Sequence, residues 1–116
     1  MAGQPVVINF IPHLIPLNRG IETTIVADLA APAGDVLALY RDFYKGEPFV
    51  RVTSALPDTK NVAMSNYCDV SVRVDPRTQR LLVSSVIDNL TKGAAGQALQ
   101  CFNLVCGYDE TLGLLA

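Results

Sequence analysis

A histidine and an arginine near the N-terminus, six positions apart, are the residues best suited to chemistry. His13 is the only histidine, and it lies between Pro12 and Pro16, which restrict the local backbone. A histidine on such a rigid loop could act as a general acid or base; the alternative is a hydrogen-bonded histidine next to the core. Arg19 precedes Gly20 in a turn, where it could bind a carboxylate or a phosphate or simply be solvated.

A second candidate site is the start of a helix built from small residues. The apolar run at 81–87 ends at Asp88 and Asn89, and the helix that follows begins with Gly93 and Gly96. Each glycine costs about 1 kcal/mol relative to alanine inside a helix, so a helix used only for packing rarely carries both. The pattern indicates the close approach of another backbone or of a flat ligand, or a close contact within the fold.

The composition predicts one globular domain over residues 1–116 and excludes several classes of function. Half of the residues are hydrophobic, the net charge is -2, and no run of Lys or Arg suggests a nucleic-acid surface. No apolar run approaches the roughly 20 residues of a membrane span, and the N-terminus lacks the pattern of a signal peptide. One histidine and three cysteines without a CxxC pair predict free thiols in a reducing cytoplasm and no metal site.

The hydrophobic pattern predicts the elements that position these groups. Alternating or continuous apolar residues predict strands at 6–11, 21–30, 49–53, 70–74 and 81–87. In the strand at 21–30, alternate residues from Ile21 onward should form one buried face. Helical spacing predicts a helix within 32–45, capped by Asp35 or a residue just before it.

The second predicted helix covers residues 93–106. Its apolar face is expected to consist of Ala94, Ala98, Cys101, Phe102 and Val105. This order of strands and helices predicts an α+β fold: a mixed, largely antiparallel sheet with helices on one face. The open face of such a sheet could pair with a second copy or with another domain.

Several segments resemble, in the same order, those of N-acetyl-gamma-glutamyl-phosphate reductase, an enzyme family of arginine biosynthesis. Residues 10–20, FIPHLIPLNRG, are similar to the family's F-T-P-H-L-x-P-x-x-R-G, with Ile11 in place of Thr. Further similar segments are EPFVRV at 47–52, SNYCD at 65–69, IDNLTKGAAGQA at 87–98 and, at the C-terminal end, GYDETLGL at 107–114. The resemblance covers nearly the whole chain.

The resemblance implies a C-terminal domain with the fold of semialdehyde dehydrogenases and GAPDH. This domain would contribute to catalysis and to dimerisation in an NADP-dependent reductase. That enzyme converts N-acetylglutamyl phosphate to N-acetylglutamate semialdehyde and phosphate. His13 matches the family's catalytic acid/base, and Arg19 matches an arginine that would bind the substrate. The corner of Asn89, Gly93 and Gly96 would face the nicotinamide end of the cofactor.

The resemblance also implies that part of the enzyme is missing. The family has a dinucleotide-binding domain that carries a glycine-rich turn and the nucleophilic cysteine, and this chain shows neither pattern. Met1 is therefore expected to be an artificial start. We expect one domain of a two-domain cytoplasmic enzyme, a homo-oligomer (dimer or tetramer), and no activity from this chain alone.

Two other functions remain open at this point. The first is the related aspartate-semialdehyde dehydrogenase, which the spacing from His13 to Arg19 fits less well. The second is a non-catalytic oligomerisation module with the same fold, in which His13 and Arg19 would have no task.

Overall fold

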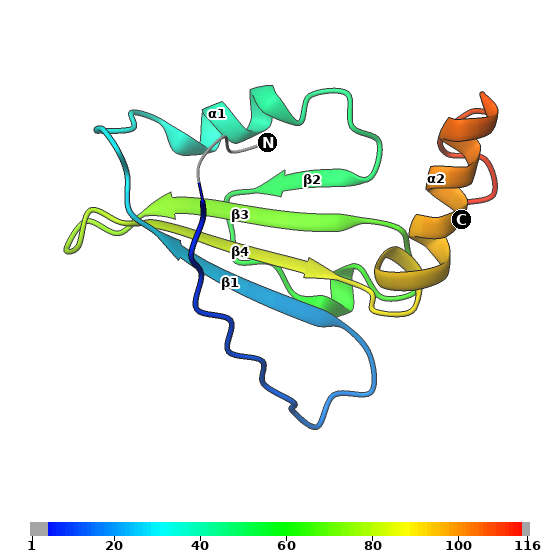
Figure 1. Ribbon diagram of the computed structural model, residues 1–116, viewed down its shortest axis with the longest axis horizontal. Coiled ribbons are helices and arrows are strands. Elements are labelled where there is room, and N and C mark those ends of the chain that lie inside the picture. The colour runs from blue at the N-terminus through cyan, green and yellow to red at the C-terminus, as the bar shows by residue number, and fades with distance from the viewer. Residues whose placement is uncertain (1–4, 115–116) are drawn as a thin grey trace.

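A four-stranded sheet forms the centre of the computed structural model, which describes residues 5–114 (Figure 1). The strands lie in the order β1 (Ile21–Ala27), β4 (Leu81–Ile87), β3 (Cys68–Val74), β2 (Val50–Thr53). β4 pairs antiparallel with both β1 and β3, whereas β2 runs parallel to β3. The predicted mixed, largely antiparallel sheet is therefore confirmed. The expectation about Met1 concerns residues outside the described range.

The β3–β4 hairpin contributes to the hydrophobic core of the sheet. Val72 faces Val83 across the pair, and both side chains are buried in the core with Val36 and Val70. At the turn, the carboxylate of Asp75 accepts a hydrogen bond from the backbone N–H of the second residue along the chain, at 3.0 Å. Alternating valines and a polar turn thus form the hairpin that the sequence predicts.

Helix α1 (Val36–Phe43) packs on the apolar face of β3 and β2. Asp35 caps it as predicted, because its carboxylate accepts the N–H of Ala38 at 2.9 Å. Val36 is the buried contact of the helix with the sheet. One helix therefore covers one half of one face.

The other half of this face, over β1, has little cover within the chain. Ile21 and Ile25 point to the same face as Val83 according to the register, yet they are 43% and 48% exposed. The alternation predicted for this strand is present, but the expected burial is not, because neither α1 nor α2 packs extensively against it. The strand also ends at Ala27 rather than at residue 30.

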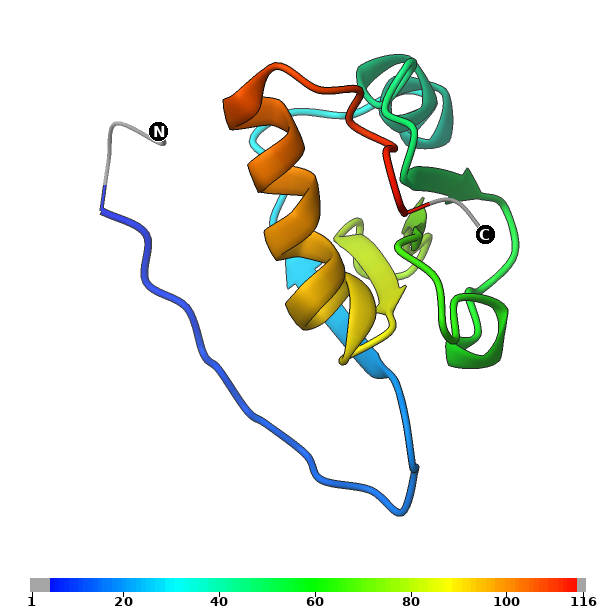
Figure 2. The same ribbon diagram turned by 90° about the vertical axis from the view of Figure 1, so that its right-hand side faces the viewer.

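The predicted strand at residues 6–11 is wrong. Residues 5–18, the N-terminal arm, form an irregular extended segment that lies clear of the sheet (Figure 2). β-branched residues favour a strand only where a neighbouring strand accepts their backbone hydrogen bonds, and no strand within residues 5–114 pairs with the arm. Its apolar side chains are exposed, with Val7 at 95%, Phe10 at 81% and Leu14 at 102%.

The second helix begins as predicted near Gly93 but buries the opposite face. A π-helical turn, η2 (Thr91–Ala95), leads into α2 (Gly96–Cys106), which stands beyond the end of the sheet (Figures 1 and 2). The predicted apolar face is exposed, with Phe102 at 55% and Val105 at 86%. Gln100 and Asn103 are buried instead, because polar loops rather than an apolar sheet lie against this helix.

Candidate active-site corner

The strand-end corner is the place where the predicted functional segments meet. It comprises residues 19–20 before β1, the loop 62–67 before β3, and residues 88–96 after β4. The pairing of Ile21 with Ile87 brings the first and last of these segments together. Strand pairing thus joins two segments that are about 70 residues apart in sequence.

Asp88 is the centre of the corner and is fully buried. Its Oδ2 accepts Arg19 Nε at 2.5 Å and the N–H of Met64 at 2.6 Å. Its Oδ1 accepts the N–H groups of Leu90 and Thr91, both at 2.8 Å. Burial raises the pKa of this carboxyl, but the hydrogen bonds from Arg19 and the three amides together lower its pKa well below the usual range.

Arg19 is tied to the corner by its side chain. Besides the ion pair with Asp88, its Nη2 donates to Thr91 Oγ1 at 3.2 Å. The side chain remains 34% exposed, so part of the guanidinium can still reach a ligand. The sequence indicates either a substrate-binding or a solvated arginine and gives no sign of this ion pair. The substrate-binding role stays a prediction.

Asn89 holds the residue next to Arg19. Its Oδ1 accepts the backbone N–H of Gly20 at 2.8 Å. The amide nitrogen of Asn89 donates no hydrogen bond within residues 5–114, so it can still offer N–H groups to a ligand. Contact of Asn89 with the nicotinamide carboxamide stays a prediction.

The two glycines lie in different surroundings. Gly96 is buried, and a Cβ there would overlap the side-chain oxygen of Asn66 and come within 2.9 Å of the Thr91 carbonyl. Gly93 is exposed, and a Cβ there would lie 3.2 Å from the Asp88 carbonyl. The close contact at Gly96 therefore lies within the fold, which was one of the two alternatives. Cofactor contact at either glycine stays a prediction.

A buried polar network beneath Gly96 was not anticipated. Asn66 is fully buried and donates to Gln100 Oε1 at 2.9 Å, while its own Oδ1 has no partner. Lys92 donates to the same Gln100 oxygen at 2.6 Å, and Gln100 donates to Glu110 at 2.5 Å. Burial lowers the pKa of Lys92. This network explains why α2 buries its polar face.

Arg51 and Asp69 connect two more of the similar segments. They are neighbours on β2 and β3, and the guanidinium binds both carboxylate oxygens, at 2.6 and 2.9 Å. The same guanidinium lies 4.3 Å from the ring centre of Tyr67. A bidentate pair of this kind fixes both side chains, so it braces the loop that leads to the corner.

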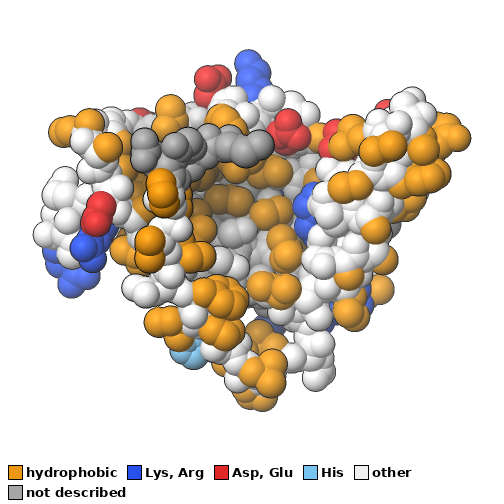
Figure 3. Space-filling view, in the orientation of Figure 1, with side chains coloured by type: hydrophobic (Ala, Val, Ile, Leu, Met, Phe, Trp, Pro, Cys, Tyr) orange, Lys and Arg blue, Asp and Glu red, His pale blue; other side chains and the backbone are white. Residues whose placement is uncertain are grey.

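His13 does not contact the corner. It lies exposed on the arm, where its Nδ1 is 3.1 Å from the Ile11 carbonyl, and it is the pale blue group at the surface in Figure 3. A carbonyl can only accept, so Nδ1 is the protonated nitrogen in this contact. Nε2 is therefore the ring nitrogen that this contact leaves available for acid/base chemistry.

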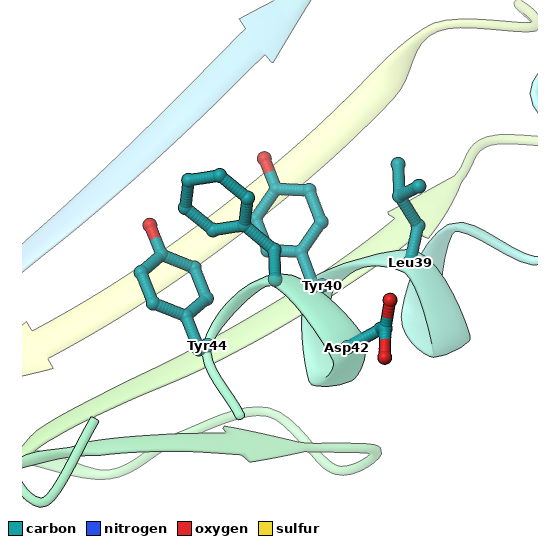
Figure 4. A pocket seen from close by; sticks show the side chains of 5 residues that line it. Leu39, Tyr40, Asp42 and Tyr44 are labelled. Atoms are coloured by element: carbon teal, nitrogen blue, oxygen red, sulfur yellow. The ribbon is translucent and has the colours of Figure 1, made fainter. Parts of the chain in front are cut away.

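Elsewhere on the molecule, a shallow hollow lies at the C-terminal end of α1, between exposed and half-buried side chains (Figure 4). It is lined by Leu39, Tyr40, Asp42, Phe43 and Tyr44. All three cysteines are free. Among the described residues, no cluster of three His, Cys, Asp or Glu side chains could bind a metal ion, and no helix is long and apolar enough to cross a membrane.

Sequence comparison identifies a family. Residues 1–89 match the family described as semialdehyde dehydrogenase, dimerisation domain. The chain is 57% identical to an N-acetyl-gamma-glutamyl-phosphate reductase of Symbiobacterium thermophilum over 99% of its length, and 54% identical to one of a Geobacter species over 98%. It is 50% identical to N-acetyl-gamma-glutamyl-phosphate reductase 1 of a Nostoc species. The chain spans about a third (34%) of the length of these relatives.

Comparison with solved structures supports the fold. Two structures of aspartate semialdehyde dehydrogenase II from Vibrio cholerae, one complexed with ASA, match with TM-scores of 0.64 and 0.63. They share 20% and 22% identity with the chain and cover 80% and 82% of it, while the chain covers 29% and 30% of theirs. At this identity the likeness concerns the α+β fold alone.

Proposed function

Because the chain belongs to the semialdehyde dehydrogenase dimerisation domain family, we propose that it is part of an NADP-dependent N-acetyl-gamma-glutamyl-phosphate reductase. The observation that carries this proposal is an identity of 50–57% over at least 98% of the chain. The substrate is N-acetylglutamyl phosphate, and the products are the semialdehyde and phosphate. This cytoplasmic reaction belongs to arginine biosynthesis.

In this proposal His13 is the acid/base group for a cysteine outside this chain. With Nδ1 bound to the Ile11 carbonyl, Nε2 takes the thiol proton. The thiolate attacks the acyl carbon, the C–O bond to phosphate breaks, and a thioester remains. After reduction, the carbon–sulfur bond breaks, the aldehyde leaves, and His13 returns its proton to the sulfur.

NADPH, when bound, supplies the hydride that reduces the thioester. Two features of the corner fit the nicotinamide end of that cofactor: the free amide nitrogen of Asn89 and the exposed, side-chain-free surface of Gly93. Gly96 lies behind this surface, where the absence of a side chain allows the helix to pack closely against Asn66. Arg19 binds a carboxylate or phosphate of the substrate with the part of its guanidinium that remains exposed.

The assembled enzyme covers the apolar surfaces that this chain leaves open. Figure 3 shows hydrophobic side chains along the arm and around the hollow between the arm and α2. Ile25 on β1 and Val105 on α2 are also exposed. Apolar surface of this extent is typical of an interface, so we propose that the enzyme is a homo-oligomer that buries it against the rest of the enzyme and a second copy.

The test is turnover by the full-length protein that contains this chain. NADPH oxidation is followed with N-acetylglutamyl phosphate and, in parallel, with aspartyl phosphate. The proposal predicts rapid oxidation with the first substrate and at least a hundredfold lower kcat/KM with the second. Faster reduction of aspartyl phosphate would indicate the related dehydrogenase instead, and no turnover of either would indicate a non-catalytic module.

A further inference from the structure

The ion pair at the strand-end corner leaves one defined edge of Arg19 free. A guanidinium has five N–H donors. Nε donates to Asp88 and Nη2 donates once to Thr91, and Arg19 makes no other hydrogen bond within residues 5–114. Three donors therefore remain, both on Nη1 and one on Nη2. Since the side chain is 34% exposed and Asp88 is fully buried, the ion pair lies on the inner side of the guanidinium.

The group that holds Arg19 is itself immobile. Asp88 accepts three backbone N–H groups, from residues 64, 90 and 91, in addition to Arg19. These amides come from two separate loops, so the carboxylate cannot rotate without losing several bonds. A long arginine side chain ordinarily loses rotamer entropy when a ligand fixes it. Here much of that cost is met by folding, before any ligand arrives.

We propose that Asp88 is a positioning residue that acts through Arg19, holding its Nη1 edge outward to bind an oxyanion of the substrate. The inference rests on the proposed function, which supplies the acyl phosphate and its carboxylate. Asp88 touches no reacting atom. It lowers KM by fixing the geometry of Arg19, because a preorganised donor pair binds an oxyanion with less loss of conformational freedom.

The test is a double-mutant cycle in the full-length enzyme with N-acetylglutamyl phosphate. Asp88→Asn and Arg19→Lys are each expected to raise KM about tenfold, with kcat within about threefold of the parent. The double variant is expected to be no more than twofold worse than Arg19→Lys alone, because Asp88 then has no arginine to position. Independent effects that multiply in the double variant, or a KM unchanged in Asp88→Asn, would overturn the proposal.

Two further variants guard against a simple loss of folding. Thr91→Val removes one acceptor of Arg19 and leaves Asp88 in place, and it is expected to raise KM about threefold. Asp28→Asn removes the carboxylate of an exposed ion pair with Arg80, and it should leave both kinetic constants unchanged. If Asp88→Asn does not fold, an unchanged KM in Thr91→Val would by itself overturn the proposal.

Binding to Arg19 is also measured without turnover. The arginine side-chain ¹⁵N resonances of the full-length protein are followed while inorganic phosphate or N-acetylglutamate is added. The proposal predicts that the Arg19 Nη signals shift with one of these probes and that Asp88→Asn weakens this binding at least fivefold. If the wild type reduces no acyl phosphate, the proposed function fails, yet this titration still decides the role of Asp88. No shift with either probe would overturn it.

Discussion

The strand-end corner and the N-terminal arm adjoin each other in the chain but differ in what fixes their structure. At the corner, Asp88 is fully buried and accepts four hydrogen bonds. On the arm, Phe10 and Leu14 are exposed and His13 bonds only to a carbonyl two residues away, within the described residues. The residues that hold Arg19 all lie within this chain, whereas the only contact of His13 among residues 5–114 is local. We therefore expect the setting of His13 to depend on surfaces outside this chain.

The largest expected effect comes from the arm. His13→Asn in the full-length enzyme should lower kcat by about 10²- to 10⁴-fold, the range for loss of a general acid or base. The free energy of unfolding should change by less than about 0.5 kcal/mol, since the side chain is exposed. Steady-state kinetics and urea unfolding give the two quantities, and Asn18→Ala is the control on the same arm. A kcat within threefold of the parent would assign His13 a structural role.

Removing the buried carboxylate of Asp88 is expected to affect the stability of the protein, in contrast to the kinetic effect expected at His13. Asp88→Ala should lower the free energy of unfolding of the chain by about 3–5 kcal/mol, because it leaves a partly buried guanidinium and three amides without their acceptor. The matched control is Asp28→Ala at the exposed pair with Arg80, which should cost no more than about 1 kcal/mol. Equal losses in the free energy of unfolding, measured by urea unfolding, would show that the buried ion pair at the corner contributes no more to stability than the exposed one.

Gly96 gives a smaller effect that tests the contact under the helix. Gly96→Ala should lower the free energy of unfolding by about 1–3 kcal/mol, because the added Cβ meets Asn66 and the Thr91 carbonyl. Gly34→Ala is the control, since a Cβ there meets nothing within 4 Å. Thermal melts of both variants make the comparison. An unchanged melting temperature in Gly96→Ala would mean that the Asn66 side chain moves aside at little cost.

The contribution of Asp88 to the free energy of unfolding should depend on pH. The pKa of Asp88 is lowered on folding, so its contribution is complete above the ordinary carboxyl pKa of about 3.9 and is lost as pH falls below it. The free energy of unfolding should therefore decrease less between pH 6 and pH 3 in Asp88→Asn than in the parent. Parallel curves from urea unfolding across this range would contradict the lowered pKa.

The sequence predicts local elements well where neighbouring residues decide them. Valines at 70, 72 and 74 alternate with polar residues, and the polar turn after them closes the hairpin as expected. Asp35 caps its helix through an N–H three residues away. In each case the partners lie within a few residues, so spacing alone reveals them.

The failures occur where distant segments decide. Residues 6–11 have the composition of a strand, but a strand needs a partner, and none is beside them. The spacing in α2 predicts that its apolar face is buried, yet Asn103 is buried instead and donates to the carbonyl of Leu112 at 2.9 Å. Asp88 gave no signal of its role, since an aspartate after a strand is usual in turns. Its partner Arg19 is 69 positions away.

Amide hydrogen exchange tests the central comparison most directly, in this chain and in the full-length enzyme. We expect slow exchange at Gly20, Met64 and Leu90 in both, because the side chain of Asn89 or Asp88 accepts the hydrogen bonds of these amides. We expect fast exchange at residues 7–11 in this chain and slow exchange at the same residues in the full-length enzyme. Slow exchange at residues 7–11 in this chain, or corner amides that exchange as fast as those of the arm, would show that the two regions are not held differently.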